Sequence, residues 1–222
     1  MTRGLFVTGT DTGVGKTVVG CALAELLRGD GADVGVMKPV ETGVGPQGPL
    51  DAISLVESAL VEDPLEEVCP ERFALPAAPI VAAEAEGRTV DLERIRNAFA
   101  RLAPRHDRML VEGAGGLLVP IARDYSMADL ARELALPLLI VTRASLGTIN
   151  HTLLTLEAAE RRDLAVAGVV ISHGPRAIST TDARNLEALR ELLGDRLVGE
   201  VPTLDPSASV ARGAIRLSAI RW

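Results

Sequence analysis

The sequence predicts an α/β fold, with a mostly parallel, doubly wound sheet and helices on both faces. Short aliphatic and β-branched runs alternate with segments whose apolar residues recur at helical spacing, a pattern typical of such sheets. A glycine-rich turn joins the first predicted strand to the first predicted helix, as in phosphate-binding α/β folds. Hydrophobic residues make up 47% of the 222 residues and aromatic residues only 2%. We therefore expect an aliphatic core and a single domain spanning residues 1–222.

The predicted strands are short apolar runs, several of them apolar on both faces. That is the pattern of a strand covered by helices on two sides. They span residues 5–8, 33–37, 109–112, 138–142, 166–172 and 197–201.

Helices are predicted between these strands. The first follows Thr17 and ends at the glycines at positions 29 and 31. Further helices are expected at about residues 91–103, around residues 149–156 and around residues 186–193, the last closed by a glycine. Two stretches fit neither element. Residues 43–50 are rich in glycine and proline, so a mobile loop is expected, and residues 62–79 hold four prolines and are expected to form an irregular excursion.

The turn between the first strand and the first helix carries a phosphate-binding pattern. It runs from Gly9 to Thr17 and ends in Gly15-Lys16-Thr17. Glycines allow successive backbone N–H groups to point at phosphate oxygens, and the helix that follows adds its positive N-terminal end. Lys16 can reach the β- and γ-phosphates, and the Thr17 hydroxyl can ligate Mg²⁺. The pattern predicts a P-loop nucleotide-binding fold.

The turn is one residue longer than the standard motif. Five residues separate Gly9 from Gly15, where the standard pattern has four. An ordinary glycine-rich turn between strand and helix is the alternative, but Gly-Lys-Thr at a strand-to-helix junction favours phosphate binding.

Two carboxylates are candidate metal ligands. Glu112 ends an apolar strand and precedes a run of small residues. Its position at the end of a strand places its carboxylate at the carboxyl edge of the sheet. Asp51 opens an apparent helix after the glycine- and proline-rich loop. Mg²⁺ prefers oxygen ligands of this kind. A buried strand-end carboxylate for Glu112 and a plain helix N-cap for Asp51 are the structural alternatives.

Lys38 follows the second predicted strand. A lysine at that edge of a phosphate-binding fold could stabilise developing negative charge, whereas a solvated surface lysine is the alternative.

Charge and composition limit the partners. The net charge is −7, from 23 Lys+Arg against 30 Asp+Glu, whereas proteins that neutralise nucleic-acid phosphates carry a basic excess. No segment approaches the ~20 apolar residues of a membrane span, and no signal-peptide pattern precedes the first strand. Cys21 and Cys69 have neither metal-site nor disulfide spacing. We expect a cytoplasmic protein with no nucleic-acid or membrane partner.

Taken together, the motifs resemble the dethiobiotin synthetase family along nearly the whole chain. The lengthened phosphate turn is a mark of that family. Four further motifs recur in the same order, namely Lys38-Pro39-Val40 with Thr42-Gly43, Val111-Glu112-Gly113-Ala114-Gly115-Gly116, Leu146-Gly147-Thr148-Ile149-Asn150-His151, and Gly199-Glu200-Val201-Pro202.

The resemblance implies closure of the ureido ring of dethiobiotin from 7,8-diaminononanoate, CO₂ and ATP, with release of ADP and phosphate. It also implies Mg²⁺ as cofactor and a homodimer with the active site at its interface. It assigns nucleotide contacts to Gly13, Val14, Gly15, Lys16, Thr17, Val18, Asp51, Glu112, Gly113, Ala114, Gly115, Ser172, Pro202, Thr203 and Leu204. It assigns metal binding to Thr17, Asp51 and Glu112, charge stabilisation in the reaction to Lys38, Lys16 and Thr12, and substrate contacts to Thr42, Leu146, Gly147, Thr148, Ile149 and Asn150.

One position departs from the family pattern. Many members carry an Asn that reads the adenine edge, where this chain has Ser172. A serine offers one rotatable hydroxyl where an amide offers fixed donors and acceptors, so looser base selectivity is expected.

Rival readings come from other classes. Partition and cell-division ATPases share this type of fold, but they carry an extra lysine early in the turn, where this chain has Asp11. Glutamine-dependent ligases with a similar start carry an added glutaminase domain, for which 222 residues leave no room. A binding module without chemistry would not need Lys38, Asp51 and Glu112 at one edge.

Overall fold

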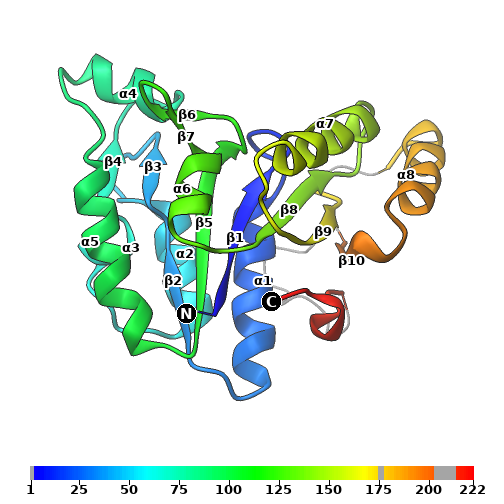
Figure 1. The fold of residues 1–222 in the computed structure, drawn as a ribbon, viewed down its shortest axis with the longest axis horizontal. Helices are drawn as coiled ribbons and strands as arrows, with labels where there is room; N and C mark the ends of the chain where they lie inside the picture. The colour runs from blue at the N-terminus through cyan, green and yellow to red at the C-terminus, as the bar shows by residue number, and fades with distance from the viewer. Residues whose placement is uncertain (1–2, 175–177, 203–213) are drawn as a thin grey trace.

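The chain folds around a six-stranded sheet in which every neighbouring pair of strands is parallel (Figure 1). The computed structural model describes residues 3–174, 178–202 and 214–222. The strands of this sheet are β1 (Gly4–Gly9), β2 (Val34–Met37), β5 (Arg108–Gly116), β8 (Leu138–Arg143), β9 (Val166–Ser172) and β10 (Leu197–Val201). All six predicted strands are present, and the prediction of a parallel α/β sheet is confirmed.

The strand order places the phosphate turn at the point where the chain reverses its direction of winding. The order is β10-β9-β8-β1-β5-β2, so β1 lies between β5 and β8. From β1 the chain first builds the β5–β2 side and then crosses to the β8 side. Ligands of open α/β sheets bind at such a switch point, beyond the carboxyl ends of the strands. The turn after β1 therefore begins at the edge where a ligand is expected.

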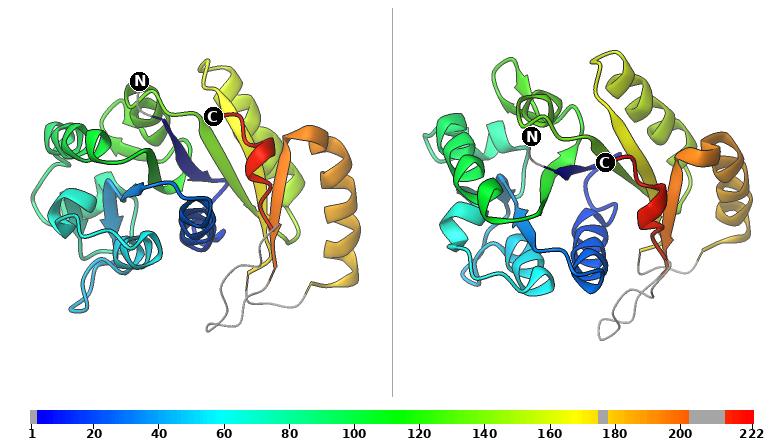
Figure 2. Two further views of the ribbon diagram at one scale, coloured as in Figure 1. Left: turned by 90° about the horizontal axis from the view of Figure 1, so that it is seen from below. Right: turned by 60° about the horizontal axis from the view of Figure 1, so that its bottom comes forward.

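Helices cover both faces of the sheet (Figure 2). On one face α1 (Lys16–Gly29) and α2 (Leu50–Ala59) pack on a cluster that includes Leu5 and Val7. On the other face the cluster includes Phe6 and side chains of α5 (Leu92–Leu102), α6 (Met127–Glu133), α7 (Thr148–Glu160) and α8 (Thr180–Leu193). Consecutive residues of β1 thus point to opposite faces, as the period of a strand requires. This explains why the strands are apolar throughout.

The helix boundaries follow local sequence signals. Asp91 caps α5 by accepting a hydrogen bond from the Arg94 N–H at 2.9 Å. Ser179 and Asp182 form a capping box at the start of α8, and Gly194 follows its last residue. The helices expected near residues 91–103, 149–156 and 186–193 are confirmed, although α7 extends to Glu160 and α8 already begins at Thr180.

The proline-rich stretch at residues 62–79 is more ordered than the sequence predicts. It contains the short helix α3 (Leu65–Val68) and the strand β4 (Glu71–Phe73), which pairs in parallel with β3 (Val40–Thr42). The elements α4 (Pro79–Ala85), β6 (Pro120–Ala122) and β7 (Tyr125–Ser126) were also not predicted. Strands of two or three residues are too short to show an alternating pattern, and a seven-residue helix is too short to show a helical period. The β3–β4 pair matters for the site because it holds the segment that follows Lys38.

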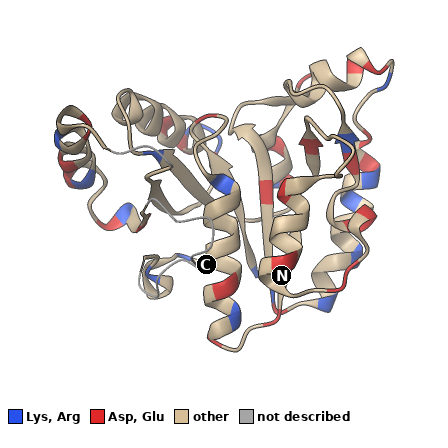
Figure 3. Cartoon of the chain, turned by 180° about the vertical axis from the view of Figure 1, so that it is seen from behind, with Lys and Arg blue, Asp and Glu red and all other residues tan. Residues whose placement is uncertain are grey.

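Charged residues of both signs are interspersed along the helices in the view of Figure 3. Among the residues that the structure describes, no helix is long and apolar enough to cross a membrane.

Candidate functional site

The phosphate turn connects β1 to α1 and is shaped by glycines. Gly13 and Gly15 have φ angles of 71° and 94°, in the left-handed region that glycine adopts without strain. Gly15 immediately precedes α1, and no side chain among the described residues caps that helix. Within that part of the chain the N-terminus of α1 has no capping side chain, as an anion site at a helix N-terminus requires.

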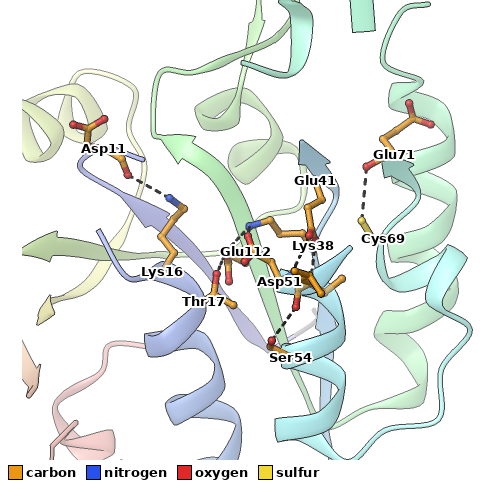
Figure 4. Close-up of polar contacts among 12 residues, drawn as sticks. Asp11, Lys16, Thr17, Lys38, Glu41, Asp51, Ser54, Cys69, Glu71 and Glu112 are labelled. Carbon is orange, nitrogen blue, oxygen red and sulfur yellow. Dashed lines mark hydrogen bonds and ion pairs between the residues drawn. The ribbon is translucent and has the colours of Figure 1, made fainter. Parts of the chain in front are cut away.

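Lys16 folds back over the turn. Its Nζ donates a hydrogen bond to the Asp11 carbonyl oxygen at 3.3 Å, and the residue is buried (Figure 4). Burial, together with the nearby Lys38 ammonium, lowers the pKa of Lys16 below its usual value. A cation that is poorly solvated and lies beside a second cation gains strongly from an anionic ligand. The neighbouring Thr12 is exposed, and its N–H donates to the Asp11 carboxylate at 2.7 Å.

Lys38 is the centre of a buried charge cluster at the carboxyl edge of the sheet. Its Nζ donates to Asp51 Oδ2 at 2.8 Å and forms a short contact with Glu112 Oε1. The Thr17 hydroxyl donates to the same Glu112 oxygen at 2.9 Å. Lys38 comes from the end of β2, Asp51 from α2, Glu112 from β5 and Thr17 from α1, so four elements converge here (Figure 4). A solvated surface lysine is therefore the wrong reading of Lys38.

Burial and pairing have opposite effects on the charges of this cluster. Burial alone lowers the pKa of Lys38, but the Glu112 and Asp51 carboxylates outweigh it and raise that pKa well above its usual value. Burial likewise raises the pKa of Asp51, but Lys38, with further help from Thr17, brings it below its usual value. Lys38 and Asp51 are therefore both charged at neutral pH. Glu112 is 1% exposed.

Asp51 is not the N-cap of its helix. Helix α2 begins at Leu50, and Pro49 at the cap position offers no side-chain hydrogen bond. Glu41 fills that role from a distance: its two carboxylate oxygens accept from the N–H groups of Asp51 and Ala52, each at 3.0 Å. Glu41 was not among the predicted site residues. The signal that could have found it is a helix that starts after Gly-Pro without a Ser, Thr, Asp or Asn at its cap, since those N–H groups must find another acceptor.

The small residues after Glu112 leave room for other parts of the chain to pack closely against β5. A Cβ on Gly113 would lie 2.9 Å from the Phe6 ring, and one on Gly115 would lie 3.3 Å from the Thr12 hydroxyl. Ala114 between them is half-buried. The run therefore packs β5 against β1 and the phosphate turn, whether or not it also contacts nucleotide.

Ser172 lies against the phosphate turn. It ends β9 and is 4% exposed, and a Cβ on Gly15 would lie 2.3 Å from its hydroxyl oxygen. Pro202 follows β10 and is exposed. The two other predicted base contacts, Thr203 and Leu204, lie outside the described residues.

The predicted substrate residues lie in two places. Thr42 ends β3 and is half-buried. The turn of residues 146–150 begins α7, with Gly147 at a φ of 91°, Leu146 and Asn150 exposed, and Ile149 half-buried. Thr148 is buried instead, and its hydroxyl shares a hydrogen bond of 2.8 Å with Thr142, to which Thr10 of the phosphate turn also donates at 3.3 Å. This threonine contact ties the start of α7 to the phosphate turn.

The donor set fits a divalent cation such as Mg²⁺. Thr17, Asp51 and Glu112 bring two carboxylates and one hydroxyl together beside the phosphate turn. The second carboxylate oxygen of Glu112, Oε2, is buried with no hydrogen-bond partner among the described residues. A buried carboxylate oxygen without a donor is costly unless a cation neutralises it. Oxygen ligands from one or two carboxylates are what Mg²⁺ uses beside phosphates.

Comparison with known proteins gives consistent matches. Residues 3–211 match the family model described as an AAA domain. The ATP-dependent dethiobiotin synthetase BioD of Anaeromyxobacter sp. (strain K) is 55% identical over 174 residues, which are 78% of this chain and 78% of that protein. The protein of the same name from Bacillus licheniformis is 42% identical over 208 residues, covering 93% of this chain and 88% of its own.

Among solved structures, the septum site-determining protein MinD from Pyrococcus horikoshii OT3, complexed with Mg-ADP, is similar in fold. Its TM-score is 0.52 at 19% identity, covering 93% of this chain and 83% of that chain. At this level of identity the likeness concerns the fold alone.

Proposed function

The chain belongs to the dethiobiotin synthetase family, and from this we infer that it closes the ureido ring of dethiobiotin from 7,8-diaminononanoate, CO₂ and ATP. The observation that carries the inference is the buried Lys38, held between Asp51 and Glu112 beside the phosphate turn. A nucleotide-binding protein needs Lys16 for its phosphates. A second buried lysine at the same edge supports a reaction in which another anion meets the γ-phosphate.

The proposed reaction has three steps. One amine of the substrate attacks CO₂ and loses a proton, which gives a carbamate. A carbamate oxygen attacks the γ-phosphorus of ATP, and ADP leaves. The second amine attacks the carbonyl carbon of the mixed anhydride and loses a proton, and phosphate departs as the ring closes. Catalysis of such a phosphoryl transfer is mainly positioning and electrostatic stabilisation.

We assign a role to each residue of the site according to where negative charge lies or develops during the reaction. Backbone N–H groups from Gly13 to Val18 bind the phosphates, with Lys16 on the β- and γ-phosphates. Lys38, Lys16 and Thr12 stabilise the carbamate and the transferring phosphoryl group. Thr17, Asp51 and Glu112 would hold Mg²⁺. When bound, the ion neutralises charge on the phosphate oxygens.

The substrate carboxylate is assigned to the turn of residues 146–150 at the start of α7. A helix N-terminus suits an anion, and Asn150 is exposed there. We place this turn at the interface of a homodimer, because Leu146 and Leu154 of the same region are 70% and 54% exposed. We further propose that residues 1–222 form a single domain and that the protein works in the cytoplasm.

The experiment that tests the function measures phosphate release with the diamine, bicarbonate and Mg-ATP, omitting each in turn. We expect release to require all three, and dethiobiotin to form in equal amount by mass spectrometry. Release that is independent of the diamine would contradict the proposal and favour a nucleotide-driven switch. Release that needs a different amine or acid would favour another ligase.

A further inference from the structure

Glu41 accepts two backbone hydrogen bonds from the first turn of a helix to which it does not belong. It lies on β3, it is 6% exposed, and each carboxylate oxygen accepts from one backbone N–H of the first turn of α2. One of those donors is the N–H of Asp51 itself. A bidentate carboxylate at a helix N-terminus is favourable, because it satisfies two unpaired donors and complements the helix dipole.

The contact fixes Asp51 from two sides. Glu41 holds its backbone, and Lys38 holds its carboxylate at 2.8 Å. Lys38 and Glu41 belong to the same segment, which is anchored by the pairing of β3 with β4, where Glu41 lies opposite Arg72. Asp51 otherwise follows a glycine- and proline-rich loop, which would fix its position only weakly. Its side chain is also 44% exposed, so packing alone does not fix its direction.

The arrangement is costly for a helix cap. Glu41 is almost fully buried close to Asp51, so its carboxylate loses most of its hydration there. A Ser or Asp at the position of Pro49 would cap α2 without a buried carboxylate. A cap from β3 has one advantage that a local cap lacks, since it ties the first turn of α2 to the segment that carries Lys38.

We propose that Glu41 is a positioning residue for the metal site, and that it holds Asp51 at the distance and direction from Thr17 and Glu112 that a divalent cation needs. The inference rests on the proposed function, in which Asp51 is a metal ligand. Partners of this outer kind orient metal-binding carboxylates, and their loss weakens metal binding by about 10- to 100-fold.

The test compares Glu41→Ala and Glu41→Gln with Asp91→Ala. The last variant removes a carboxylate that caps α5 locally, on the other face of the sheet. The dissociation constant of Mn²⁺ is measured by electron paramagnetic resonance with saturating ADP, and the melting temperature is measured alongside. We expect Glu41→Ala to weaken Mn²⁺ binding by about tenfold or more. Glu41→Gln, which keeps one acceptor, should weaken it less, and Asp91→Ala should lower the melting temperature without changing Mn²⁺ affinity.

Mn²⁺ affinity within twofold of wild type in Glu41→Ala would overturn the proposal, and so would equal weakening in Asp91→Ala. If Glu41→Ala does not fold, unchanged affinity in Glu41→Gln would overturn it. Asp51→Asn distinguishes failure of the metal assignment from failure of the positioning role. If this variant binds Mn²⁺ as wild type does, the metal assignment of the proposed function fails. If it binds weakly while the Glu41 variants bind normally, only the positioning role fails.

Discussion

Lys38 Nζ donates to Glu112 Oε1, the same carboxylate oxygen that accepts from the Thr17 hydroxyl. A metal ion on Glu112 and Asp51 would share both carboxylates with the Lys38 ammonium, because Nζ also donates to Asp51 Oδ2 at 2.8 Å, even where the ion binds Glu112 through the other oxygen, Oε2. Two cations on one carboxylate repel each other. Lys38 and a divalent cation should therefore compete for these carboxylates when no phosphate chain is present to attract them both.

That competition predicts tighter metal binding when Lys38 is replaced by an uncharged residue of similar length. We expect Lys38→Met to bind Mn²⁺, without nucleotide, on the order of tenfold more tightly than wild type, a gain of about 1.4 kcal/mol. Lys38→Arg, which keeps the charge, should show no such gain. Mn²⁺ affinity that is unchanged or weaker in Lys38→Met would contradict the competition.

Substitutions in the phosphate turn should weaken nucleotide binding, whereas substitutions of the metal ligands should raise the Mg²⁺ requirement. Lys16→Ala should weaken nucleotide binding about 10- to 100-fold, since hydrogen bonds to charged groups contribute about 1.5–3 kcal/mol. Glu112→Gln should instead raise the Mg²⁺ concentration for half-maximal activity by at least the ~10-fold typical of losing an outer partner. Isothermal titration with ATP and a Mg²⁺ titration of activity separate the two. Equal nucleotide affinity in wild type and Lys16→Ala would argue against the assigned phosphate contact.

Because β5 packs closely against β1 at Gly113, a single methyl group added there should destabilise the fold. A Cβ on Gly113 would lie 2.9 Å from the Phe6 ring, which is itself fully buried. We expect Gly113→Ala to lower the free energy of unfolding by about 1–3 kcal/mol, the usual cost of overpacking. Gly45→Ala is the matched control, because no atom of the residues that the structure describes lies within 4 Å of a Cβ there. Chemical denaturation measures both, and equal stability of the two variants would show that the Phe6 ring moves aside freely.

The parallel sheet could be predicted because its strands are long enough to show their pattern. The β3–β4 pair could not, since Val40–Thr42 and Glu71–Phe73 have three residues each and lie in proline-rich surroundings. Their pairing depends on contacts between distant parts of the chain, which no local period records.

Some residues of the site could likewise be predicted from the sequence, and others could not. The turn from Gly9 to Thr17 is a local motif, and Glu112 could be placed because strand ends of a parallel sheet share an edge. Glu41 was missed because its role depends on a helix that begins at Leu50, after Pro49 and distant in sequence from β3. The small residues after Glu112 make room for Phe6, Val119 and the Thr12 hydroxyl, and the sequence does not indicate the contacts with Phe6 and Thr12 because both come from distant parts of the chain.

Base selectivity is expected to be looser than in relatives that carry an Asn at the position of Ser172. The Ser172 hydroxyl lies against Gly15 and is almost fully buried, so it has little freedom to read a base edge. Competition titrations of ATP against CTP and GTP test this expectation. A preference for ATP of a thousandfold or more, roughly 4 kcal/mol, would show that recognition does not depend on this position.

Lys38 should matter most for the chemical step. ATP can bind without it, because the phosphates have Lys16 and the α1 N-terminus, and the substrate carboxylate is assigned to the turn that begins α7. Lys16 is also assigned to the β- and γ-phosphates, so Lys38 is the cation assigned chiefly to the carbamate, whose negative charge must come within bonding distance of an anionic γ-phosphate. Lys38 is buried and carries a firmly held charge at that edge of the sheet. Its contribution should therefore be largest as the two anions meet.

We accordingly expect Lys38→Ala to lower turnover by on the order of 10²–10³ while ATP affinity changes little, a loss of a few kcal/mol of electrostatic stabilisation. Single-turnover formation of dethiobiotin measures the chemical step directly, and ATP titration of the same variant measures binding. Arg88→Ala is a suitable control, because it removes a half-exposed cation that pairs with Glu71 away from the phosphate turn. If the Lys38→Ala rate stays within a factor of about three of wild type, Lys38 serves only to neutralise Asp51 and Glu112, and another group must stabilise the carbamate.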